Sequence, residues 1–244
     1  MLTLRSSSLA GLLTGFALLV FGAQANALTV PFGDTANYWP GYGNGPLDDN
    51  VDTIGAPNLL GGRAILNGSG LLTRVEIDYT GPFSPPVGSG NPGHVIPGDL
   101  FLDKDADGDW DYVMRLVASP ETAVANYASL TILDVSSVLP VYINTAGDNA
   151  GWWAGYLIRD AHPYAWNAGG TVVGTGSLDP YNQLSGGTVT LGFNLSGLAV
   201  GSQVRIGFAE NCANDVLYQT VAVPEPSTAL ILGAGLLLLA RRRA

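Results

Sequence analysis

The sequence has few cysteines, lysines and charged residues of any kind, and each shortage excludes a class of protein. Cys212 is the single cysteine, so an intramolecular disulfide framework and zinc sites built on paired cysteines are excluded. Charged residues make up only 12% of the chain, and Lys104 is the only lysine. No Gly-x-Ser-x-Gly, His-Glu-x-x-His or phosphate-loop pattern occurs, so the hydrolases and nucleotide-binding proteins that carry these motifs find no support.

Basic residues are especially scarce between the two ends of the chain. Residues 28–222 contain 19 of the 20 acidic residues but only six basic ones, a balance of −13. Neither nucleic acid nor an anionic surface could be neutralised by so few cations, so we expect no nucleic-acid partner. The six basic residues are Arg63, Arg74, Lys104, Arg115, Arg159 and Arg205.

Catalytic side chains are equally hard to assemble from the sequence. His94 and His162 each stand next to glycine or proline, which is typical of solvated turn residues, and nothing pairs either with a nucleophile. Glycoside cleavage needs only two suitably spaced carboxylates, but no spacing singles out a pair. We therefore expect no enzyme, and keep a weak carbohydrate-active hydrolase or lyase as an alternative. The carboxylates considered are Glu76, Asp78, Glu121 and Glu210.

The first 27 residues have the pattern of a secretory signal peptide. Arg5 precedes an apolar stretch from Leu9 to Phe21, and small residues, Ala25 and Ala27, occupy the two positions that a signal peptidase reads. We expect an N-terminal signal helix in 1–27 and cleavage before Leu28.

The other end carries an apolar run with unusual flanks. Residues 229–240 follow Pro224, Glu225 and Pro226 and precede three arginines, 241–243. About a dozen residues span roughly 18 Å as a helix, less than the hydrocarbon core of roughly 30 Å, so the helix is a poor permanent anchor. The arginines favour the cytoplasmic side, which leaves the preceding chain outside. The prolines keep their segment extended, as a processing enzyme requires.

These three parts, in this order, resemble the PEP-CTERM sorting signal, over residues 223–244. The resemblance implies that a membrane-embedded exosortase recognises Pro224, Glu225 and Pro226 and removes the tail. It also implies a Gram-negative host that makes exopolysaccharide, transient anchoring in the inner membrane, and delivery to the cell surface or extracellular matrix. Signal peptidase and exosortase are the expected partners.

The middle of the chain, 28–222, alternates with the period of β-strands and lacks a long helical period. Turn signals such as Gly61-Gly62 separate the strand-like runs. The pattern predicts an all-β domain, a single two-sheet β-sandwich with a jelly-roll-like arrangement. The expected strands cover 73–79, 98–102, 110–117, 130–135, 138–143, 152–158, 171–173, 189–195 and 204–209. This region also resembles the β-sandwich ectodomains, mostly without assigned activity, that often precede PEP-CTERM tails.

One acidic segment has the pattern of a calcium loop. Five aspartates alternate along 103–111 with a glycine at loop position 6, the arrangement by which a tight loop surrounds a hard cation with oxygen ligands. Methionine stands where an EF-hand has glutamate, so the loop is similar to strand-flanked DxDxDG loops. We expect structural Ca²⁺ here, with a soluble acidic turn as the alternative. The expected ligands are the side chains of Asp103, Asp105, Asp107 and Asp111 and the backbone carbonyl of Asp109.

Aromatic residues offer a second kind of site. Trp153 and Trp166 belong to a tryptophan-rich stretch, and exposed aromatic rings on a sandwich can stack on sugars. Core packing is the other interpretation of the same residues. The exit strand of the acidic loop is predicted to place four side chains on one face, those of Trp110, Tyr112, Met114 and Leu116. The sequence thus predicts a non-catalytic, exported, calcium-stabilised β-domain, with an exopolysaccharide-binding module as the alternative.

Overall fold

The computed structural model describes residues 27–40, 42, 57–81, 97–116, 129–144, 162–179, 187–210 and 215–224. Every regular element within these residues is a β-strand, which confirms the all-β prediction. The expected helices at the two ends lie outside the described residues. The strands are β1 (Leu28–Phe32), β2 (Asn58–Leu66), β3 (Leu72–Thr80), β4 (Leu100–Asp103), β5 (Tyr112–Leu116), β6 (Leu130–Asp134), β7 (Tyr142–Asn144), β8 (Pro163–Trp166), β9 (Thr171–Leu178), β10 (Thr188–Leu198), β11 (Gln203–Ala209) and β12 (Val216–Ala222).

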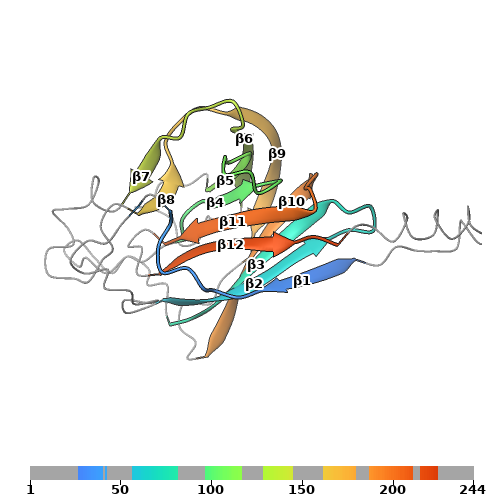
Figure 1. Cartoon of the computed structure of the whole chain (residues 1–244), viewed down its shortest axis with the longest axis vertical. Helices are drawn as coiled ribbons and strands as arrows, with labels where there is room; N and C mark the ends of the chain where they lie inside the picture. Colours follow the sequence, from blue (N-terminus) through green and yellow to red (C-terminus); the bar gives the residue numbers. More distant parts are fainter. Residues whose placement is uncertain are drawn as a thin grey trace, which may run out of the picture.

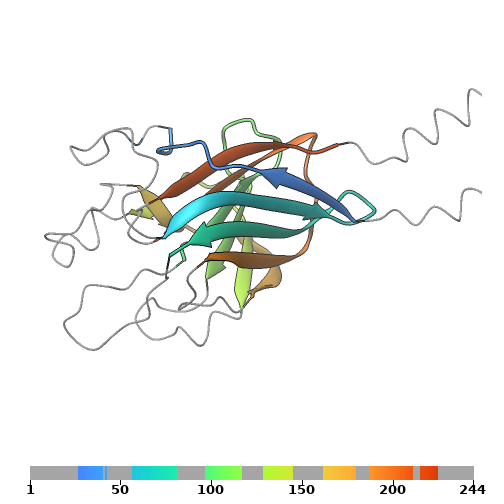
Figure 2. The same ribbon diagram turned by 90° about the horizontal axis from the view of Figure 1, so that it is seen from below.

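Ten of these strands form one antiparallel sheet in the order β1-β2-β3-β10-β9-β6-β5-β4-β11-β12, and β7 and β8 form a separate two-stranded sheet. The long sheet curls until its edge strands β1 and β12 come into contact, so it is nearly barrel-shaped (Figures 1 and 2). The two separate sheets of a sandwich are therefore not confirmed. β9 is the reason: its first part pairs with β6 and its end with β10, which joins the two halves of the sheet.

The inner core lies between these two halves. Val75, Ile77 and Tyr79 of β3 are fully buried and pack in the same cluster as Ile206 and Phe208 of β11. Their neighbours Arg74, Glu76 and Asp78 face outward, as the period-two alternation predicts. Burial of these apolar side chains, each contributing about 1.5–3 kcal/mol, holds the curled sheet together.

An outer core covers the other face of the β4–β5 half. Trp39 is 2% exposed and packs edge-on against Phe101 at a centroid distance of 5.2 Å. Trp110 joins this cluster, whereas Tyr112 and Met114 pack against the inner core. The prediction that Trp110 shares their face is wrong, because residues 110 and 111 precede β5 and do not follow its alternation. His162, predicted to be solvated, is fully buried near Tyr42.

The turn predicted at Gly61-Gly62 is also wrong, because both glycines lie inside β2. The register between β2 and β3 shifts between Leu59 and Gly62, which marks a β-bulge. Gly61 has a φ of +93°, and a Cβ on Gly62 would lie 1.8 Å from the carbonyl oxygen of Glu76. Glycine at this point therefore permits a close strand approach rather than a chain reversal.

Within the described residues, no helix is long and apolar enough to cross a membrane.

Candidate metal loop and sorting tail

The acidic loop connects β4 to β5 and is built around Asp103. This aspartate is 1% exposed, and its carboxylate accepts hydrogen bonds from the backbone N–H groups of Asp107 (3.2 Å) and Gly108 (2.9 Å). Gly108 has a φ of +114°, a conformation that side chains with a Cβ rarely adopt. Asp107 in turn accepts the N–H of Asp109 at 3.0 Å. The carboxylates thus fold the loop through its own backbone.

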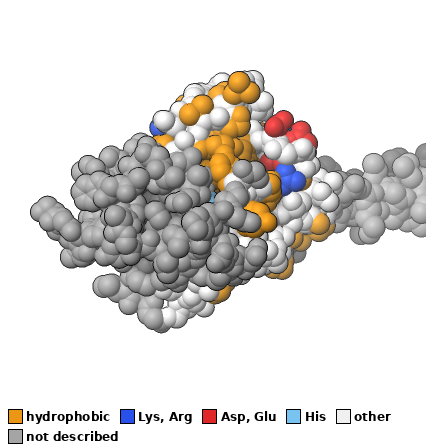
Figure 3. All heavy atoms as spheres, turned by 60° about the vertical axis from the view of Figure 1, so that its left-hand side comes forward, with side chains coloured by type: hydrophobic (Ala, Val, Ile, Leu, Met, Phe, Trp, Pro, Cys, Tyr) orange, Lys and Arg blue, Asp and Glu red, His pale blue; other side chains and the backbone are white. Residues whose placement is uncertain are grey.

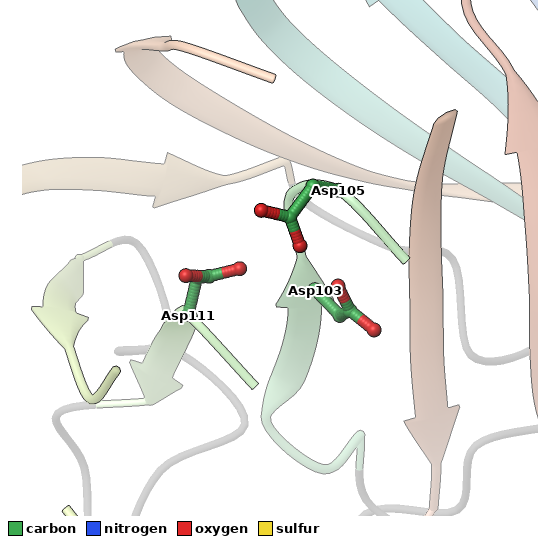
Figure 4. Close-up of side chains that lie close together, drawn as sticks. All are labelled: Asp103, Asp105 and Asp111. Carbon is green, nitrogen blue, oxygen red and sulfur yellow. The ribbon is translucent and has the colours of Figure 1, made fainter. Parts of the chain in front are cut away.

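Three of the five predicted aspartates come together at the base of the loop. Asp103, Asp105 and Asp111 each offer one carboxylate oxygen, and these atoms all lie within 4.8 Å of one another. Asp103 and Asp105 project from the end of β4, and Asp111 lies opposite them where the chain enters β5 (Figure 4). Asp107 and Asp109 are not part of this group. Three oxygen donors at this separation suit a hard cation such as Ca²⁺.

Two protein cations contact these same carboxylates. The Lys104 ammonium pairs with Asp111, which raises the pKa of Lys104 despite the opposing effect of burial. Arg205 of β11 donates to Asp103 at 2.8 Å and to the carbonyl oxygen of Ala106 at 3.2 Å. Acidic side chains with basic ones beside them are visible on the surface in Figure 3. Sequence spacing gave no sign of Arg205, because only the pairing of β11 with β4 brings it to the loop.

The predicted sugar-stacking platform is not open at Trp166. This side chain is 1% exposed, its ring packs edge-on against Tyr142, and its indole N–H donates to the carbonyl oxygen of Gly169 at 2.9 Å. Trp166 is therefore a core residue. Trp153 lies outside the described residues.

The strand carboxylates considered for catalysis lie in an ion-pair network, here called the polar face. Arg63 donates to Glu76 at 2.6 Å and to Asp78 at 3.0 Å, and Arg74 donates to Glu76 at 2.7 Å. Burial raises the pKa of Glu76, but hydrogen bonds from the two arginines outweigh it, so the pKa lies below its ordinary value. Ionised, paired carboxylates do not act as general acids.

Arg74 also reaches Asp179 at 2.5 Å. That hydrogen bond is the main cause of the lowered pKa of Asp179. Asn194 and Thr190 of β10 complete the polar face by hydrogen bonds to Asp179 and Asp78.

Asp99 is a further carboxylate with a shifted pKa. It is 3% exposed, and burial raises its pKa to about 6. Its two oxygens accept the backbone N–H groups of Leu116 (2.9 Å) and Trp166 (2.8 Å). The side chain therefore connects β5 to β8, a structural role that the sequence pattern did not predict.

Glu210, the other described carboxylate that we considered for catalysis, is fully buried. It accepts the backbone N–H of Asp215 at 2.8 Å, and Asp215 accepts the N–H of Leu59 at 2.7 Å. These side chains connect the ends of β11, β12 and β2. Glu121 lies outside the described residues.

The sorting tail begins where β12 ends. Ala222 pairs with Gln203, and the N–H of Val223 donates to the carbonyl oxygen of Ser202 at 2.8 Å. The same turn touches the acidic loop, since the N–H of Gly201 donates to the carbonyl oxygen of Lys104 at 2.7 Å. Pro224 is exposed, and the rest of the predicted motif lies outside the described residues. The first residue of the motif therefore lies at the surface, directly after the buried Val223.

Comparison with known proteins bears on the tail alone. Residues 222–244 match the PEP-CTERM protein-sorting motif. No curated protein and no solved structure matches the chain. The motif implies export, a membrane-anchored sorting signal and exosortase as the processing partner. The chain therefore carries a PEP-CTERM sorting motif at its C-terminal end.

Proposed function

We propose that the chain is a non-catalytic protein of the cell surface or extracellular matrix, whose β-domain is stabilised by calcium at the β4–β5 loop. The domain is delivered by the signal peptide and released from its tail by exosortase. The observation that carries the calcium site is the group formed by Asp103, Asp105 and Asp111, with carboxylate oxygens within 4.8 Å of one another.

The charge balance of the loop supports this proposal. Five aspartates stand against two contacting cations, Lys104 and Arg205, which leaves a charge of −3. Carboxylates this close repel one another, and a divalent ion would remove most of that repulsion. An exported protein meets calcium at millimolar concentration, so a weak structural site would be occupied.

The absence of catalysis is supported by the environments of the described carboxylates. Glu76 and Asp78 are held by arginines, and Glu210 is buried. The buried position of Trp166 removes one of the two rings expected to stack on exopolysaccharide, so no observation favours that alternative over a structural role.

Thermal unfolding of the mature protein, with calcium and with chelator, tests the metal. Calcium at 100 times its dissociation constant would stabilise the fold by about 2.7 kcal/mol. For a domain of this size, that corresponds to a rise in Tm of roughly 5–10 °C. Magnesium at equal ionic strength is the control, because its smaller ion demands a tighter octahedral site. Identical melting curves in calcium and chelator would contradict the proposal.

A further inference from the structure

The folded domain continues up to Val223, the residue directly before Pro224, Glu225 and Pro226 of the sorting motif. Val223 is 8% exposed and belongs to the inner core, and its N–H is bonded to Ser202. Pro224, the next residue, is exposed. One residue spans at most about 3.6 Å, so no spacer separates the core from the motif.

The chain enters β1 and leaves β12 at the same end of the sheet (Figures 1 and 2). Leu28 pairs with Leu66 beside the β2–β3 turn, and Ala222 pairs with Gln203 at the start of β11. β1 and β12 contact each other and run side by side in both ribbon views (Figures 1 and 2). A tail held in the membrane would therefore bring this end of the folded domain against the membrane surface.

A processing enzyme that grips an extended peptide needs several residues on each side of the bond it attacks. On the domain side of Pro224 these residues are Val223 and the end of β12, whose backbone is hydrogen-bonded to β11 and the turn before it. A strand cannot pair with its sheet and lie in an enzyme groove at the same time.

We propose that the fold withholds the sorting motif from exosortase, and that Val223 must leave the inner core before the motif is processed. This inference rests on exosortase processing, as proposed above. Val223 is a positioning residue: its burial and its bond to Ser202 keep the end of β12 in place. Opening of a strand end is a local event, so the processing rate follows the population of the opened end.

Pulse-chase labelling of the full chain in its exosortase-containing host measures this rate. Val223→Ala removes two buried methyl groups and should speed processing about tenfold, because the opened end becomes more populated. Inserting six Gly/Ser residues between Val223 and Pro224 should speed it at least as much without touching the core. In the insertion background, Val223→Ala should add nothing.

Val75→Ala is the matched control, because Val75 lies in the same core but far along the chain, on β3. It destabilises the whole domain without freeing the end of β12, so the processing rate should rise less than it does with Val223→Ala. Equal acceleration by Val75→Ala would show that global unfolding sets the rate. An insertion variant processed at the wild-type rate would also overturn the inference.

A variant with alanine at Pro224, Glu225 and Pro226 separates this inference from the proposed function. It should remain unprocessed in the inner membrane. If it is released normally, exosortase processing itself is refuted. If it is retained while Val223→Ala and the insertion have no effect on the rate, only the further inference fails.

Discussion

The polar face and the acidic loop are two clusters of charged residues on the same sheet, and they differ in how far their charges are balanced. On the polar face, Arg63 and Arg74 bridge three carboxylates, and each of these charged groups has a partner of opposite sign. In the loop, five aspartates share two cations. The charges of the polar face nearly cancel, whereas the acidic loop keeps a net charge of −3.

The difference follows from how each cluster is assembled. Cross-strand neighbours in a sheet place opposite charges face to face, as in the register of Arg63 with Glu76. A tight loop brings like charges together, because its own N–H groups are satisfied by carboxylates such as Asp103. A surface that is internally paired is stable without a ligand, while an unbalanced loop gains from a cation.

Asp103→Ala should produce the largest loss of stability. It removes the partner of Arg205, whose side chain is 18% exposed, and the acceptor of two loop N–H groups. Loss of one member of a buried ion pair costs about 3–5 kcal/mol, measurable by urea unfolding, and calcium dependence should disappear with it. Asp109→Ala is the control, because Asp109 is exposed and the calcium template uses only its backbone carbonyl. Equal losses in the two variants would count against the assigned roles.

Arg74→Met should lower the free energy of unfolding by an intermediate amount, about 1–2 kcal/mol at neutral pH. The reason is that it removes partly buried ion pairs with Glu76 and Asp179. The pKa values of both carboxyls are lowered in the folded protein from ordinary values of 4.5 and 3.8. Their contribution to stability is therefore present above about pH 4.5 and is lost as the pH falls through the lowered pKa values of the folded state. Unfolding measured from pH 7 to pH 2 should show this acid-linked loss in the wild type and less of it in Arg74→Met.

A double-mutant cycle checks that assignment. Asp179→Asn alone should destabilise the fold, but in the Arg74→Met background it should add little. Fully additive effects would show that the two side chains do not stabilise each other.

Lys104→Met should have the smallest effect on stability and the most specific one on binding. Without calcium, Asp111 loses its ammonium partner, and the fold should weaken by less than about 1 kcal/mol, because the lysine is half-exposed. With calcium, removal of a competing cation should tighten binding about fivefold to tenfold by isothermal calorimetry. Lys104→Arg, which keeps the charge, should behave like the wild type. Weaker calcium binding by Lys104→Met would be the contrary result.

Much of the fold could be read from periodicity, and the exceptions have physical causes. β3, β10 and β11 show clean alternation, and their inward residues are those the pattern selects. β2 was not expected because its bulge at Gly61 and Gly62 breaks the alternation and mimics a turn. Strands β1, β8 and β12 were also not predicted. The predicted strand 152–158 and the signal peptide before Ala27 lie outside the described residues.

The sequence by itself determined the all-β class, the acidic loop and the sorting tail, because each depends on residues that are neighbours along the chain. Only the tertiary structure decided which side chains from distant segments come into contact. Arg205 reaches Asp103, Trp166 enters the core, and Val223 binds the turn at Ser202 through contacts between distant segments. Local patterns specify which side chains alternate or cluster, but strand pairing sets their long-range partners.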